Sequence, residues 1–83
     1  MPQHTRVDVL PIQEVVATAS PSAWRDGLVV AQGDAQVTVA LLDGDLRVLT
    51  TRATPQPGEP VAVHPVAGLL ALGGVWYAAR PSV

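Results

Sequence analysis

The chain contains no cysteine, lysine, asparagine or phenylalanine among its 83 residues. Without cysteine there is no disulfide to stabilise so short a chain, and the two histidines, His4 and His64, are too few for a structural metal site. A domain of this size buries only about 60–65% of the surface of its unfolded chain. We therefore expect no cofactor, and we expect self-association or a partner protein to supply additional buried area.

Positive charge is also scarce. Five arginines are scattered along the chain, and the formal net charge is -2. A nucleic-acid interface needs a dense basic stripe that displaces phosphate counterions, so we do not expect one here. The longest stretch without a formal charge, residues 61–79, is interrupted by a proline and three glycines, so we expect no transmembrane helix. No secretory signal is evident at the start, which favours a cytoplasmic protein.

Turn signals divide the middle segment, DGLVVAQGDAQVTVALLDGDLRVLTT, into three strands. Two-residue turns at Gly33-Asp34 and Asp43-Gly44 predict a meander, in which Leu41 lies opposite Leu46. A three-residue loop at the second turn would mix apolar and polar residues on each face, so we favour the two-residue loop. The predicted core side consists of Leu28, Val30, Val37, Val39, Leu41, Leu46 and Val48.

The last third predicts a surface loop, a short strand and a hairpin. Residues 55–60 contain three prolines and Gly58, residues 61–64 alternate, and Gly73-Gly74 joins two apolar strands. In that hairpin the adjacent Trp76 and Tyr77 point to opposite faces, and both faces are apolar. A small barrel covers only one of them, so we expect the other to contact another protein chain. The predicted contact residues are Trp76, Tyr77, Leu69 and Trp24.

The N-terminal part is less regular. Residues 6–10 alternate and predict a strand, and QEVVATA (13–19) fits a strand or one helical turn, with its β-branched Val15-Val16 pair favouring a strand. Residues 1–5 are expected to form an arm that is flexible or bound to a partner. Five to seven short strands and no convincing helix predict a single all-β domain, a small antiparallel barrel that is OB-like or related.

Residues suited to catalysis are few. Most of the seven carboxylates, among them Asp26, Asp34, Asp43 and Glu59, adjoin a glycine, as is typical of exposed turns. The serines lie in no nucleophile-elbow motif, the glycine pair belongs to no phosphate-binding loop, and His64 beside Pro65 is more typical of a packed or surface histidine than of a general base. We therefore expect neither enzymatic activity nor a small-molecule substrate.

Residues 26–80 resemble the small β-barrel domains of tailed-phage virion proteins, found in minor tail, tail-tip and baseplate proteins. The matching features are Gly27–Val30, the strand Val37–Val39, the Asp43-Gly44 turn, the segment Pro55–Val63 and the closing aromatic strand Gly74–Tyr77. The resemblance implies a structural protein of the virion, assembled in the host cytoplasm into a ring or oligomer with other virion proteins. The alternative is an OB-like accessory module that binds a small oxyanion or nucleic acid.

Overall fold

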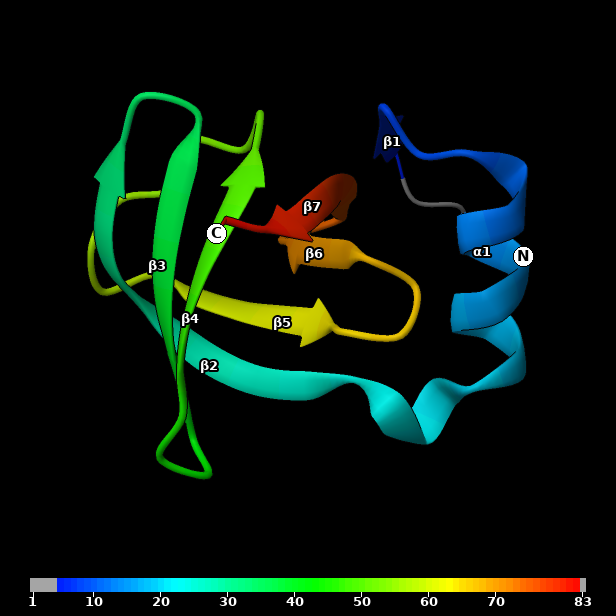
Figure 1. Ribbon diagram of the computed structural model, residues 1–83, viewed down its shortest axis with the longest axis horizontal. Coiled ribbons are helices and arrows are strands. Elements are labelled where there is room, and N and C mark those ends of the chain that lie inside the picture. The colour runs from blue at the N-terminus through cyan, green and yellow to red at the C-terminus, as the bar shows by residue number, and fades with distance from the viewer. Residues whose placement is uncertain (1–4, 83) are drawn as a thin grey trace.

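The computed structural model describes residues 5–82, which form seven strands, with two short helices between the first strand and the second (Figure 1). The elements are β1 (Thr5–Val7), α1 (Pro11–Ala19), the 3-10 helix η1 (Pro21–Ala23), β2 (Arg25–Gly33), β3 (Gln36–Leu41), β4 (Leu46–Thr51), β5 (Pro60–His64), β6 (Leu69–Leu72) and β7 (Val75–Pro81). His4 and the predicted arm lie outside the described residues, except for Thr5, which begins β1.

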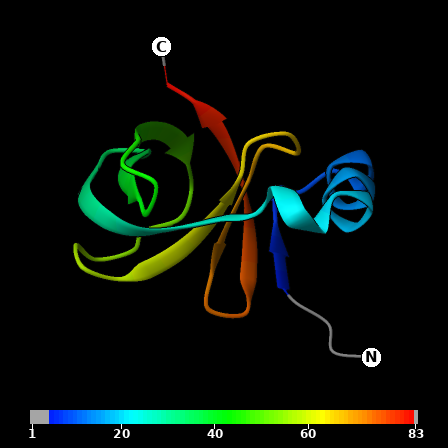
Figure 2. The same cartoon turned by 90° about the horizontal axis from the view of Figure 1, so that it is seen from below.

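Six strands close into an antiparallel barrel in the order β7-β4-β3-β2-β5-β6, with β6 pairing back onto β7. The additional strand, β1, runs parallel to β7. Figure 2 shows β1, β6 and β7 between the β2–β4 part of the barrel and α1. The prediction of a small all-β barrel is confirmed. Its six strands are one more than the five of the OB-fold.

The β3–β4 connection is a three-residue loop, so the predicted two-residue register is wrong. Ala40 pairs with Leu46, and the Leu41 N–H donates to the Asp45 carbonyl at 2.8 Å. Gly44 takes a φ of 101°, and the Asp43 carboxylate accepts the Asp45 N–H at 3.0 Å, which stabilises the longer loop. Because side chains alternate along a strand, this one-residue shift turns β4 over.

The β2–β3 turn is also displaced by one residue. Gly33 pairs with Gln36, so the loop is Asp34-Ala35, with Ala35 at a φ of 57°. The register then shifts between Val29 and Ala31, at a β-bulge. The result is that Val29, not its neighbours, points into the barrel.

Because of these two register shifts, four of the seven predicted core positions are wrong. Val37, Val39 and Leu41 are buried as predicted, whereas Leu28, Val30, Leu46 and Val48 are exposed. On β4 the buried positions are Leu49 and Thr51. The predicted core side of β3 is therefore right, and those of β2 and β4 are wrong.

The final hairpin has the predicted register. Leu70 pairs with Tyr77 and Ala71 with Trp76, around a two-residue turn in which Gly73 has a φ of 61°. The β4–β5 connection turns at Gly58, whose φ is 94°. Pro55, the first residue of the predicted surface loop, is fully buried, so this loop belongs partly to the core.

Residues 11–19 form α1, so the interpretation of QEVVATA as a strand is wrong. Pro11 occupies the first turn, where its missing N–H is tolerated, and the Gln13 side chain accepts the Leu10 N–H at 2.9 Å. The Gln13 amide also donates to the carbonyls of Ala67 and Gly68, both at 3.1 Å, and ties the helix to the β5–β6 turn. These tertiary contacts override the local β propensity.

The apolar interior consists of two clusters. The barrel cluster fills the space between the strands and includes Val29, Val39 and Leu70, with Tyr77 packed against it. The helix cluster lies between α1 and the outside of the barrel, and consists of Ala17, Ala67 and Leu69, with Val9, Val16, Trp24 and Trp76 packed against it.

Gly27 of β2 pairs with both β3 and β5, and the neighbouring atoms leave no room for a side chain at this position. A Cβ atom at this position would lie 2.7 Å from Val39 Cγ1 and 2.8 Å from the Ala40 carbonyl oxygen. Gly33, in the same strand, has no atom within 4 Å of the equivalent position. Only a glycine therefore allows β2 to pass β3 at this distance, whereas Gly33 is under no such constraint.

Candidate interaction surfaces

The predicted contact residues lie mostly under α1. Leu69 is fully buried in the helix cluster, so its prediction as a contact residue is wrong. Trp24 and Trp76 are half-buried and pack on each other with ring centroids 5.1 Å apart, and Tyr77 is half-buried against the barrel cluster. The hairpin does need cover on both faces, but α1 of the same chain covers the second face, where we expected another protein.

His64 connects the barrel to the segment that follows α1. Its Nδ1 accepts the Ala67 N–H at 3.0 Å, so Nε2 carries the proton and donates to the Ser20 carbonyl at 2.9 Å. The ring is fully buried and meets Trp24 edge to face, with centroids 5.0 Å apart. Both nitrogens are satisfied within the fold, so His64 is a packed histidine with a structural role.

The outer side of the β2–β4 meander carries the four residues that the register shifts expose. We call Leu28, Val30, Leu46 and Val48 the outer sheet face; they are 45, 52, 66 and 41% exposed. Leu28 pairs with Ala40, which pairs with Leu46, so one apolar row crosses three strands. An antiparallel sheet with one buried face usually has a polar outer face, whereas this one carries four exposed aliphatic side chains beside Thr38.

A second apolar surface lies on α1. We call Ile12, Val15 and Ala19 the outer helix face; their spacing of three and four residues places them on the side opposite the buried Ala17, with the half-buried Val16 at the edge of this face. Ile12 is 63% exposed and Val15 is 61% exposed. A shallow groove of about 350 Å³ runs along this helix and is lined by Glu14, Val15, Thr18 and Ala19. The helix is therefore apolar on both sides, although only one side contacts the barrel.

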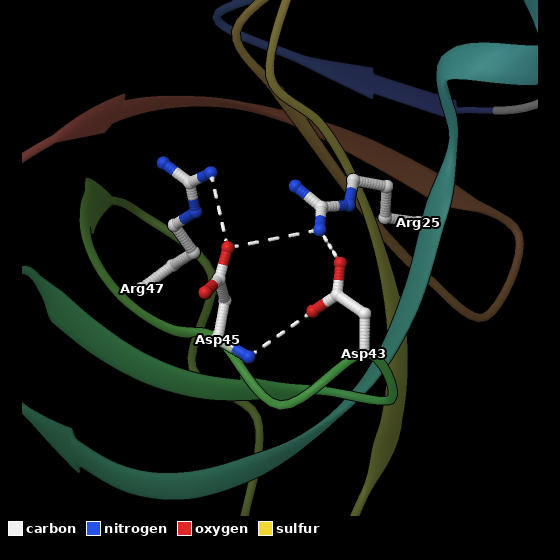
Figure 3. Close-up of polar contacts among 4 residues, drawn as sticks. All are labelled: Arg25, Asp43, Asp45 and Arg47. Atoms are coloured by element: carbon white, nitrogen blue, oxygen red, sulfur yellow. Dashed lines mark hydrogen bonds and ion pairs between the residues drawn. The ribbon is translucent and has the colours of Figure 1, made fainter.

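Four charged residues form an ionic cluster beside the β3–β4 loop (Figure 3). Arg25 pairs with Asp43 and lies 3.7 Å from Asp45, whose carboxylate is also 3.7 Å from Arg47. All four side chains are about one-third or more exposed. The charges neutralise one another, so the cluster orders the loop and offers no excess charge to a ligand.

A cleft of about 510 Å³ opens between the start of α1 and the ends of β4 and β7, lined in part by Asp8, Thr50, Arg52 and Arg80. Arg52 Nε lies 3.0 Å from the Asp8 carboxylate. Arg80 makes no ion pair among the described residues. The cleft therefore offers one uncompensated cation to an anionic group.

The described part of the chain contains no three His, Asp or Glu side chains grouped closely enough to hold a metal ion. Within residues 5–82, neither helix has the length and apolar character needed to cross a membrane. Comparison with protein families, with curated proteins and with solved structures finds no match for the chain.

Proposed function

We propose that this protein is a non-catalytic structural component that assembles with copies of itself and with other proteins through its outer sheet face. The observation that carries the proposal is the exposure of Leu28, Val30, Leu46 and Val48 on adjacent strands. Exposed aliphatic side chains that form one patch are typical of interaction sites, whereas isolated ones are ordinary. The resemblance to barrels of phage virion proteins supports a virion as the setting of this assembly.

The composition supports the same function. Only 14% of the residues are charged, against about 25% in an average soluble protein. Complete burial of a leucine or valine side chain contributes about 1.5–3 kcal/mol, so covering the exposed halves of four of them contributes about 3–6 kcal/mol. Association costs about 4–15 kcal/mol in lost motion, so this face alone gives a weak contact. A repeated contact in a closed assembly strengthens it through multivalency.

Sedimentation velocity of the full chain tests the proposal, with Leu46→Lys as the disrupting variant and Val66→Lys as its matched control. Leu46 is 66% exposed on the outer sheet face, and Val66 is 69% exposed in the β5–β6 turn. We expect Leu46→Lys to abolish association and Val66→Lys to retain it. Equal association of both variants, or a wild-type monomer that also binds no protein encoded by a neighbouring gene, contradicts the proposal. Mass spectrometry of purified particles tests the virion setting.

The uncompensated Arg80 favours one second candidate, the binding of a small oxyanion in the cleft beside Arg52. Nucleic acid is less compatible, because Trp24 and Trp76 pack on each other and Tyr77 packs on the barrel cluster, which leaves no stacking platform. Calorimetric titration with phosphate and with a dicarboxylate tests this candidate. Binding that Arg80→Gln abolishes supports it, and no heat of binding at millimolar phosphate or dicarboxylate contradicts it.

A further inference from the structure

The two apolar faces lie at opposite ends of the molecule. The β2–β4 meander forms one end and α1 the other, with β6 and β7 between them (Figures 1 and 2). The outer helix face exposes Ile12 and Val15 by more than half, and the outer sheet face exposes Leu46 to a similar extent. Because α1 exposes Ile12 and Val15 on the side away from the barrel, in addition to the side chains that it buries, it has the character of an element with a second partner.

We propose that the outer helix face of one copy packs on the outer sheet face of the next, so that copies associate head to tail. This inference rests on the proposed function, because it names the partner of the sheet face. A two-fold contact between identical faces would cover one apolar face and leave the other in water. A head-to-tail contact covers both in every copy, and packing a helix on a sheet is a standard layer arrangement.

The available area matches the size of a specific interface. The exposed fractions correspond to roughly 300 Å² of apolar surface on each face, so one contact removes about 600 Å² of it from water. Apolar atoms make up about 57% of a typical interface, which gives a total of about 1,000 Å², the size at which specific contacts begin. Because a head-to-tail pair still has one free helix face and one free sheet face, on different copies, the contact propagates into a ring where the rotation closes and into a filament where it does not.

Two variants, each with one blocked face, test the geometry. Leu46→Lys blocks the outer sheet face, Val15→Lys blocks the outer helix face, and Val66→Lys is the control. Sedimentation velocity of the wild-type chain and the control should show species larger than a dimer. Each blocked variant alone should be monomeric, with the dissociation constant raised at least tenfold. An equimolar mixture of the two should form a dimer, because the free sheet face of Val15→Lys meets the free helix face of Leu46→Lys.

Other outcomes separate this inference from the proposed function. If Val15→Lys associates like the wild type and mixing produces no new species, the head-to-tail contact is wrong, while the sheet face remains the assembly surface. If Leu46→Lys associates like the wild type, both are wrong. If the wild-type chain stays monomeric, the head-to-tail contact is wrong. The proposed function is still upheld in that case if the wild type binds proteins encoded by neighbouring genes and Leu46→Lys does not. Tryptophan fluorescence and circular dichroism confirm that each variant is folded.

Discussion

The same substitution at two positions of β2 should change stability in opposite directions. In Gly27→Ala, the new methyl group would lie 2.7 Å from Val39 Cγ1 and 2.8 Å from the Ala40 carbonyl oxygen. The valine side chain has some freedom to rotate, but the carbonyl belongs to β3, which is paired along both of its edges. The backbone must therefore shift. In Gly33→Ala the methyl group meets no atom within 4 Å.

The expected magnitudes follow from two opposing effects. Overpacking a well-filled site costs about 1–3 kcal/mol, and more where backbone atoms must move. Replacing glycine by alanine also lowers the entropy of the unfolded chain, which stabilises a compatible site by about 0.4–1 kcal/mol. We therefore expect Gly27→Ala to lose about 2 kcal/mol in free energy of unfolding. Gly33→Ala should gain up to about 1 kcal/mol, because its backbone lies outside the left-handed region.

Urea unfolding followed by the fluorescence of Trp24 and Trp76 measures both effects. At a slope of about 1 kcal/mol per molar urea, typical of a small domain, Gly27→Ala should lower the midpoint by about 2 M and Gly33→Ala should raise it by up to about 1 M. The protein concentration is kept low so that association does not contribute to the midpoint. Equal midpoints for the two variants would refute the close-packing argument.

Three further substitutions test the remaining contacts. Trp76→Ala removes a ring that packs α1 against the barrel, so we expect a loss of about 2–3 kcal/mol and faster hydrogen exchange in α1 than in the strands; uniform acceleration would contradict this. His64→Ala leaves the Ser20 carbonyl and the Ala67 N–H unpaired and should cost about 3 kcal/mol or more in thermal unfolding; a loss under 1 kcal/mol would show that these bonds contribute little. Arg25→Met should change stability by less than about 1 kcal/mol, because its ion pairs are solvent-exposed, and a loss above 2 kcal/mol would contradict that interpretation.

The barrel and the register of the β6–β7 hairpin could be predicted from the sequence. The registers of the β2–β3 and β3–β4 pairs could not. Gly73-Gly74 leaves little choice of loop, so the pairing of Leu70 with Tyr77 follows directly. The Asp43-Gly44 pair serves a two-residue or a three-residue loop, and hydrophobic patterning normally decides between them. On β4 it could not, because Leu46 and Val48 are as apolar as the residues that face inward. The exposed outer sheet face is thus also the cause of the wrong register.

The helix was missed for a different reason. Val15 and Val16 favour a strand locally, whereas the contacts that stabilise α1 come from Ala67 and Gly68, more than fifty residues away. The local signals for a helix are Pro11 and Glu14 in the first turn and Gln13 three residues after Leu10. Because the helix was absent from the expected fold, the cover over Trp76 was assigned to another chain.

Because β7 is the last strand of the chain and pairs with three others, the barrel can close only after the C-terminal residues have been synthesised. This strand pairs with β6, with β4 and, in parallel, with β1, so Thr5 meets Val75 across almost the whole chain. Contacts between such distant residues form slowly, and they require the C-terminal strand to have been synthesised. Until then the β2–β4 meander exposes apolar side chains on both of its sides. A chain shortened before Ala79 would lose the pairing that joins β7 to β4, and its open barrel edges would be prone to intermolecular pairing.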